Sequence, residues 1–145
     1  MIKKYTLQQM QEFTKHMPFN THLGIEVVKV HNDGLTISLN LREEFRNVAQ
    51  VLHGGVTASM ADAAVGLALV RHFAATMMLS TIELKVNYFR PVWGKKVTAR
   101  AKLIRVGKQI CVGSVDIHDD ENKHAGVALV TYMVLGPRKH GMPTA

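Results

Sequence analysis

The sequence predicts an α+β fold in which one curved antiparallel sheet wraps around a single long helix. A run over about 55–72 is apolar nearly throughout and lacks proline, as expected of a helix buried on all sides. Six other stretches alternate between apolar and polar residues, or are continuously apolar, and predict strands. With 145 residues the chain is long enough for one sizeable core, so we expect a single domain over 1–145.

The residues before the long helix predict a short helix and a hairpin. Apolar residues at helical spacing over 6–16, with Thr6 available as the N-cap, predict a short amphipathic helix within about 1–18. Two strands follow, joined by the turn residues 31–34, and the second strand alternates strictly over 35–41. The mixed, charged segment that follows is expected to be a loop leading into the long helix.

Four consecutive antiparallel strands are predicted after the long helix, over 81–90, 96–106, 110–118 and 126–135. The first strand is expected to turn the following side chains to one face: Ile82, Leu84, Val86 and Tyr88. Residues from about 137 to 145 are predicted to be a frayed tail. Because a sheet with all its apolar faces on one side covers a helix by curling around it, the pattern predicts a curved sheet.

The composition narrows the classes of function. Lys and Arg number 18 and Asp and Glu 11, a net charge of +7 that suits an anionic small molecule, a nucleic acid or an anionic membrane surface. Aromatic residues are not interleaved with basic ones, which argues against nucleic acid, and the apolar run is too short to span a bilayer. A single cysteine, Cys111, and the lack of a signal-peptide core predict a cytoplasmic protein. The histidines have no metal-ligand spacing, so no metal is expected.

The start of the long helix carries the candidate chemistry. His53-Gly54-Gly55 leads into it, and the first N–H groups of a helix lack partners and carry the positive end of its dipole. Since glycines leave room for a ligand, we expect the N–H of Gly55 to be an oxyanion donor toward a carbonyl oxygen of the ligand. Asp62 is expected to act on water as a general base or to attack the carbonyl carbon directly.

Gly55 and Asp62 are too far apart on one helix to act on one carbonyl. They are separated by seven residues, which is about 10 Å along the axis at about 1.5 Å per residue. We therefore expect a site that is shared between two subunits.

Residues around the start of the long helix carry a resemblance to a known family. They are Asn47, then His53-Gly54-Gly55, then Met60-Ala61-Asp62-Ala63 in the helix, and a strand that begins at Thr81. In these residues the sequence resembles the hot-dog fold acyl-CoA thioesterases. Within them it is most similar to the phenylacetic acid degradation subgroup. The resemblance implies hydrolysis of an aryl- or fatty-acyl-CoA to the free acid and coenzyme A, without a further cofactor. It also implies a homodimer as the minimal active unit, with a homotetramer expected, and no nucleic-acid or membrane partner.

The resemblance assigns roles to individual residues. Asn47 and His53 are turn-side polar contacts, Gly55 is the oxyanion donor, and Asp62 of the other subunit is the base or nucleophile. Thr81 is expected to help hold the attacking water, or Ser80 if the strand begins one residue earlier. The further residues expected to bind substrate are Gly54 at the turn, Arg90, Arg105 and Lys108 for the coenzyme A phosphates, and Phe73 and Met77, with Leu69 and Met78, at the pocket floor.

Several alternatives remain open from the residues alone. His53 is equally well explained as fixing the turn through a backbone hydrogen bond. For Asp62 the less favoured alternative is a helix-start carboxylate that makes capping hydrogen bonds. A hot-dog dehydratase or hydratase of 3-hydroxyacyl thioesters would need a histidine and a carboxylate placed together. A non-catalytic acyl-CoA binding module would bind the same ligand without releasing thiol.

Overall fold

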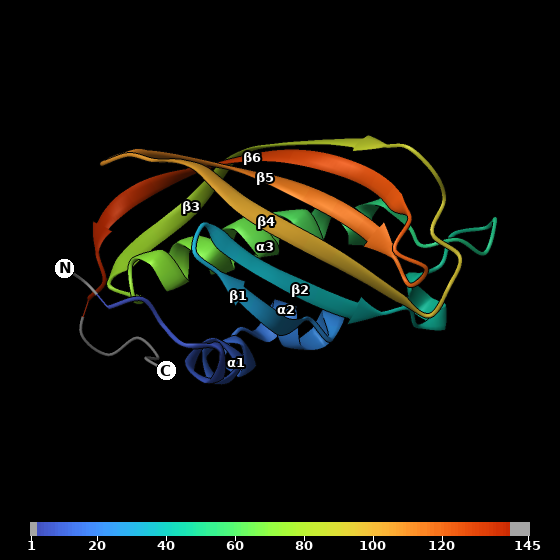
Figure 1. Cartoon of the computed structure of the whole chain (residues 1–145), viewed down its shortest axis with the longest axis horizontal. Coiled ribbons are helices and arrows are strands. Elements are labelled where there is room, and N and C mark those ends of the chain that lie inside the picture. Colours follow the sequence, from blue (N-terminus) through green and yellow to red (C-terminus); the bar gives the residue numbers. More distant parts are fainter. Residues whose placement is uncertain (1–2, 140–145) are drawn as a thin grey trace.

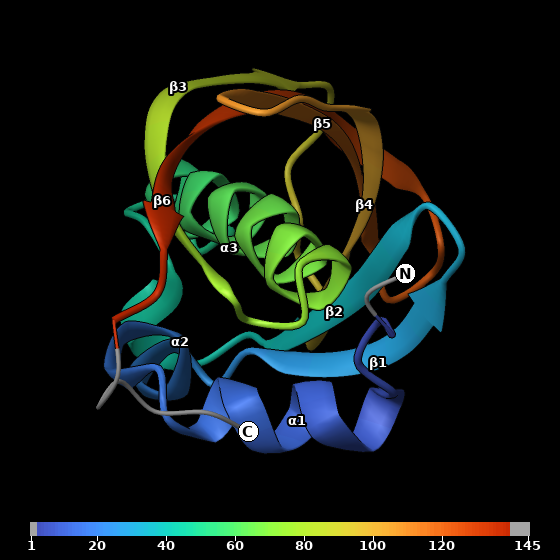
Figure 2. The ribbon, with the colours of Figure 1, turned by 90° about the vertical axis from the view of Figure 1, so that its left-hand side faces the viewer.

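The computed structural model describes residues 3–139, which form a six-stranded antiparallel sheet curled around one long helix (Figure 1). Figure 2 shows this helix, α3, inside the curve of the sheet. The elements in chain order are α1 (Leu7–Lys15), α2 (Pro18–Leu23), β1 (Glu26–His31), β2 (Gly34–Asn40), a 3₁₀ turn (Glu43–Phe45), α3 (Gly54–His72), β3 (Met77–Tyr88), β4 (Lys96–Val106), β5 (Ile110–Asp119) and β6 (His124–Pro137).

The strands lie in the order β1-β2-β4-β5-β6-β3. β3 pairs with β6, the last strand, and not with β4, which follows it in the chain and pairs with β2 instead. The two edges of the sheet are therefore β1 and β3. α1 packs against β1, whereas β3 has no strand beside its outer edge in the part of the chain that the structure describes. The outer edge of β3 leaves backbone N–H and C=O groups without strand partners.

α3 is the centre of the hydrophobic core, as predicted. It begins at Gly54, one residue before the expected start, and ends at His72. Its small and medium apolar side chains let the sheet approach closely, and these are wholly buried: Met60, Ala61, Ala64, Val65, Leu67 and Leu69. Among the described residues, no helix has the length and hydropathy needed to cross a membrane.

The N-terminal segment forms two short helices where one was expected. Thr6 caps α1 as predicted, because its side-chain oxygen accepts the N–H of Gln9 at 3.3 Å. The chain then becomes extended at Met17, because the residue before a proline is disfavoured in the helical region. Pro18 opens α2, where its missing N–H costs no hydrogen bond.

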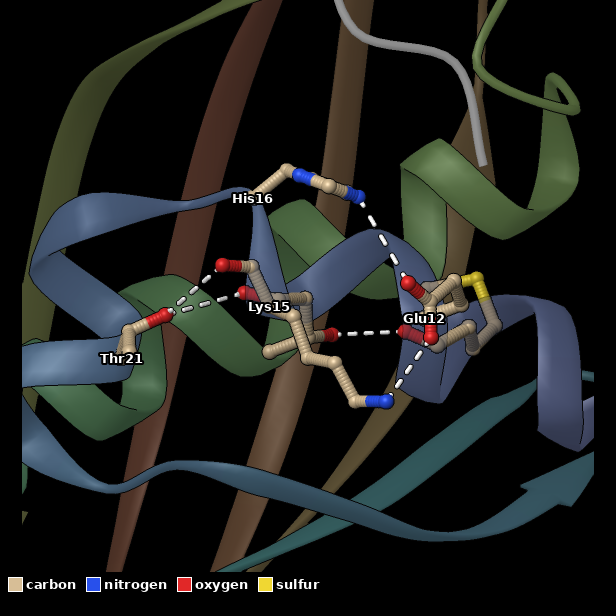
Figure 3. Close-up of polar contacts among 6 residues, drawn as sticks. Glu12, Lys15, His16 and Thr21 are labelled. Atoms are coloured by element: carbon tan, nitrogen blue, oxygen red, sulfur yellow. Dashed lines mark hydrogen bonds and ion pairs between the residues drawn. The ribbon is translucent and has the colours of Figure 1, made fainter.

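Polar contacts at the C-terminal end of α1 connect it to α2 (Figure 3). The carboxylate of Glu12 lies 2.8 Å from Lys15 Nζ and 3.6 Å from His16 Nε2. Thr21, on α2, places its hydroxyl 3.3 Å from the carbonyl oxygen of Lys15. The Glu12 contacts lie within α1 and its cap and, being exposed, contribute little to stability, so the polar link to α2 is the hydroxyl of Thr21.

A β-bulge interrupts β3 beside Thr81. Thr81 lies opposite Tyr132 of β6, and Glu83 opposite Thr131, so Ile82 is the extra residue. Ile82 is 51% exposed, which contradicts its expected inward position; Leu84 and Val86 pack against the core as expected. The bulge exchanges the two faces of the strand at this point, a change that alternation in the sequence does not reveal.

The C-terminal strand is longer than the sequence indicated. β6 extends through Pro137, and the N–H of Arg138 donates to the carbonyl oxygen of Thr76 at 2.7 Å. The tail predicted from about 137 therefore begins at least two residues later. Its last part, 140–145, lies outside the described residues.

Candidate active site

Asp62, in the third turn of α3, receives two hydroxyl groups on one carboxylate oxygen. Thr81 Oγ1 donates to Asp62 Oδ1 at 2.8 Å, and the Tyr132 hydroxyl lies 2.8 Å from the same oxygen. The side chain of Asp62 is half-buried. Within residues 3–139, Oδ2 has no hydrogen-bond partner and no cation pairs with the carboxylate. One oxygen is thus held, and the other is available to a water molecule.

Thr81 reaches Asp62 because of the bulge at Ile82. A bulge commonly re-aims a side chain next to an active site. The hydroxyl that was expected to hold the attacking water donates to the carboxylate itself in this structure. Ser80, the alternative for this role, is exposed, lies opposite Met133, and makes no hydrogen bond to Asp62 in the described part of the chain.

Tyr132 is a site residue that sequence reasoning missed. It lies on β6, and its hydroxyl also contacts the backbone carbonyl oxygen of Asp62 at 3.0 Å. Burial, and then the neighbouring Asp62 carboxylate, raise the pKa of Tyr132 well above its usual range. A lone tyrosine in a nearly continuous apolar strand was the available signal, because a buried tyrosine needs a partner for its hydroxyl. Its position 70 residues from Asp62 concealed which partner that is.

The N-terminal turn of α3 is capped by His53. Its Nδ1 accepts the N–H of Gly55 at 2.9 Å, while its carbonyl oxygen accepts the N–H of Val56 at 2.9 Å. The N–H predicted to be a free oxyanion donor is therefore occupied in this structure. Because Nδ1 accepts, we assign the ring hydrogen of neutral His53 to Nε2.

Asn47 and Tyr88 shape the backbone around this turn. Asn47 Oδ1 accepts the N–H groups of Ala49 at 2.9 Å and Val51 at 3.4 Å, and so closes the loop before His53. The Tyr88 hydroxyl donates to the carbonyl oxygen of Gly54 at 2.6 Å, and burial raises the pKa of this phenol. The sequence placed Tyr88 on a strand face but gave no reason to assign it to the turn.

A cleft of about 600 Å³ opens beside the turn. Its lining includes Asn47, Gly54, Gly55, Tyr88 and Arg90, which come from the loop before α3, the start of α3, the end of β3 and the segment that follows β3. Asp62 is not among the lining residues. One copy of the chain thus presents two separate half-sites on the same helix, the turn with its cleft and the carboxylate with its two hydroxyl donors.

The remaining predicted substrate contacts lie elsewhere. Phe73 ends α3 and Met77 begins β3, and both are half-buried, but Leu69 is wholly buried and unavailable to a ligand.

The three cations that were expected to bind the coenzyme A phosphates lie at opposite ends of β5. Arg105 and Lys108 line a hollow at the turn between β4 and β5. Arg90 lies beside the turn at the other end of β5, with its N–H 3.3 Å from the carbonyl oxygen of Ala125. At roughly 3.3 Å per residue, the length of β5 separates these ends by about 30 Å, so one copy does not bring the three cations together.

Other ligand sites receive little support. A second cleft, of about 470 Å³, lies between α1, α2 and β1, and contains none of the predicted site residues. In the described ranges, no three His, Cys, Asp or Glu side chains gather closely enough to hold a metal ion. Cys111 is wholly buried, and burial raises the pKa of its thiol, which disfavours a nucleophilic role.

Comparison with known proteins identifies the family. The model of the thioesterase superfamily matches residues 49–125, more than half of the chain. The medium/long-chain acyl-CoA thioesterase YigI of Escherichia coli is 36% identical, over 84% of this chain and 88% of its own length. The 1,4-dihydroxy-2-naphthoyl-CoA hydrolase of Listeria monocytogenes is 26% identical, over 81% of this chain and 95% of its own length.

Solved structures agree with these relatives. The crystal structure of thioesterase HI1161 from Haemophilus influenzae superimposes with a TM-score of 0.85 at 29% identity, covering 96% of each chain. The predicted hot-dog fold is thus confirmed. The match to the family model, the identity to YigI and this superposition together show that the chain belongs to the thioesterase superfamily.

Proposed function

We propose that the protein hydrolyses acyl-CoA thioesters to the free acid and coenzyme A, in active sites that two copies of the chain build together. The observation that carries this proposal is the placement of two incomplete half-sites on α3. The turn at Gly55 offers a cleft and a helix N-terminus, and Asp62 offers a carboxylate with one free oxygen. They lie about 10 Å apart along one helix, so a second copy must complete each site.

The half-site at the Asp62 carboxylate activates the attacking water. Asp62 accepts a proton from water through Oδ2, and the water oxygen attacks the carbonyl carbon of the thioester. Oδ1 is held by Thr81 and Tyr132, an arrangement that suits a fixed general base. When the tetrahedral intermediate collapses, the carbon–sulfur bond breaks and the proton passes to the sulfur of coenzyme A. One water is consumed, and the acid and the thiol are released.

The half-site at the turn before α3 stabilises the negative charge that develops on the carbonyl oxygen of the thioester. This oxygen takes the place of His53 Nδ1 as the acceptor of the Gly55 N–H, at the positive end of the α3 dipole. His53 then serves to keep the turn in shape in the free enzyme. Arg90, which lines the same cleft, is placed to meet a phosphate of coenzyme A.

The outer edge of β3 is the surface through which we expect the second copy to bind. It is a twelve-residue strand with unpaired backbone groups and the exposed apolar side chain of Ile82. If two β3 strands pair antiparallel across a two-fold axis, their α3 helices lie antiparallel on the same side of the joined sheet. The turn of one copy then faces Asp62 of the partner subunit. The tetramer implied by the family resemblance stays a prediction.

We propose a medium- or long-chain acyl group as the substrate class. The support is the name of the 36% identical YigI and the half-buried Phe73 and Met77, which lie at the far end of α3 from the turn. An extended acyl chain that starts at Asp62 and follows the helix would reach them. Assignment to the phenylacetic acid degradation subgroup stays a prediction, and an aryl-acetyl substrate would favour it.

Thiol release from a panel of acyl-CoA substrates tests the proposed function. We expect turnover that rises from short to medium and long acyl chains, and its loss in Asp62→Asn, which keeps the shape of the side chain. Asp116→Asn, at an exposed carboxylate of β5, is the matched control and should keep parental activity. Parental thiol release by Asp62→Asn would refute the role of Asp62. Conversion of enoyl thioesters without thiol release would indicate a hydratase instead.

A further inference from the structure

The phenol of Tyr132 bridges the side chain and the backbone of Asp62. Tyr132 is 7% exposed, and its hydroxyl lies 2.8 Å from Asp62 Oδ1 and 3.0 Å from the Asp62 carbonyl oxygen. A contact that spans both parts of one residue restricts the rotation of its side chain. The bridge therefore fixes the carboxylate relative to α3, and not only relative to the sheet.

Gly66 leaves the space that this hydroxyl occupies. It lies on α3 one turn after Asp62, and a Cβ built there would be 2.6 Å from the Tyr132 hydroxyl oxygen and 3.2 Å from Cζ of the same ring. The first distance is too short for any real contact. Glycine is a poor residue for the interior of a helix, so its presence here is explained by the approach of the phenol.

Both groups that hold the carboxylate are neutral hydroxyls. Thr81 from β3 and Tyr132 from β6 donate to Oδ1, and no Lys, Arg or His in the described part of the chain lies within ion-pair distance of Asp62. Because burial raises the pKa of Tyr132, its hydroxyl remains a donor over the whole pH range of an assay.

We propose that Tyr132 is a positioning residue for Asp62, and that Gly66 provides the room it needs. Tyr132 does not reach the reacting atoms. It holds Oδ1 so that Oδ2 is presented to water. The inference rests on the proposed function, because it assigns Tyr132 to a general base.

A split between kcat and KM for thiol release tests the role of Tyr132. In Tyr132→Phe we expect about a tenfold loss of kcat with KM changed by less than about twofold, because the carboxylate is no longer held in place while substrate binding is untouched. Tyr5→Phe, which removes a phenol hydroxyl on the N-terminal segment, is the matched control and should keep the parental kcat and KM. The NMR signal of the Asp62 carboxyl carbon at one fixed pH, assigned with Asp62→Asn, should move in Tyr132→Phe and reports on the contact without depending on activity.

Gly66→Ala tests the same contact without removing the phenol. Its Cβ displaces the hydroxyl, so we expect a loss of kcat like that of Tyr132→Phe. Added to Tyr132→Phe, it should cause no further loss, because the hydroxyl is already absent. A parental kcat and an unchanged Asp62 carboxyl signal in both single variants would overturn the inference, even if their melting temperatures fell. An active Asp62→Asn would overturn the proposed function instead, and the NMR signal would still report on the contact.

Discussion

Replacing His53 by alanine separates the two roles that this side chain can have. The variant loses the 2.9 Å hydrogen bond from the Gly55 N–H to Nδ1 and leaves the first turn of α3 uncapped. The loss of an N-cap costs about 1 kcal/mol, which for a chain of this size lowers the melting temperature by about 3 °C. Because the Gly55 N–H, and not His53, is proposed to bind the thioester oxygen, thiol release should stay within about tenfold of the parent.

His53→Asn is the matched control, because asparagine is a strong N-cap and should restore most of the melting temperature. Melting must be followed at one protein concentration, since dimer stability depends on it. A loss of thiol release of about 10² or more in His53→Ala, with an unchanged melting temperature, would contradict the reasoning. The Nε2–H of His53 would then be the oxyanion donor, and the cap would be incidental.

Three further predictions concern the fold. Cys111 is buried, and burial raises the pKa of its thiol. At about pH 8 it should therefore react with a disulfide reagent far more slowly in the native protein than in the urea-unfolded protein. Equal rates in the two states would contradict its burial. Arg100 donates a hydrogen bond to Asp33 and lowers the pKa of that carboxyl in the folded protein. The pair therefore adds to the free energy of unfolding at any pH above the pKa that Asp33 has in the unfolded chain. This contribution is lost as the pH falls through the lower pKa that Asp33 has in the folded protein. In denaturant titrations, Asp33→Asn should lower the free energy of unfolding by less than about 1 kcal/mol at neutral pH, since the pair is partly exposed. Below about pH 4 the variant should lose less stability than the parent does, because it has no Asp33 carboxyl to protonate. The same dependence of stability on acid pH in both proteins would argue against the pair. Gly113→Ala places a Cβ 2.8 Å from both Cγ atoms of Val65, so the free energy of unfolding should fall by about 1–3 kcal/mol, and an unchanged denaturation midpoint would show that the core relaxes freely.

The elements of the fold were predictable because their patterns are local. The apolar run identified α3 to within one residue of its start, and turn residues identified the hairpin of β1 and β2. The break at Pro18 was also encoded locally, but the short helix α2 that follows it was not predicted, because the apolar spacing was read only over 6–16. The pairing of β3 with β6 was not predictable, because alternation indicates which face of a strand is buried but not which strand lies beside it.

The candidate site was predictable only in part. The spacing from the turn to Asp62 follows directly from the sequence, and the resemblance supplied Thr81, which the structure places against Asp62. The bulge at Ile82, which directs Thr81 inward, has no signal in a pattern of alternating residues. Tyr132 was missed because its contact joins residues distant in the chain, and the engagement of the Gly55 N–H depends on the orientation of a histidine ring.

Complementation between two inactive variants tests the shared site most directly. Asp62→Asn removes the carboxylate half, and Gly54→Val obstructs the turn half, since its Cβ starts 3.2 Å from the Tyr88 ring and its branches extend beyond it. Each variant, checked for folding by circular dichroism, should be inactive alone. After mixing and subunit exchange at equal concentrations, half of the dimers are mixed and each has one intact site, so thiol release should return to roughly a quarter of the parental value. Mixed dimers that are detected by mass spectrometry but release no thiol would contradict a site built by two copies of the chain.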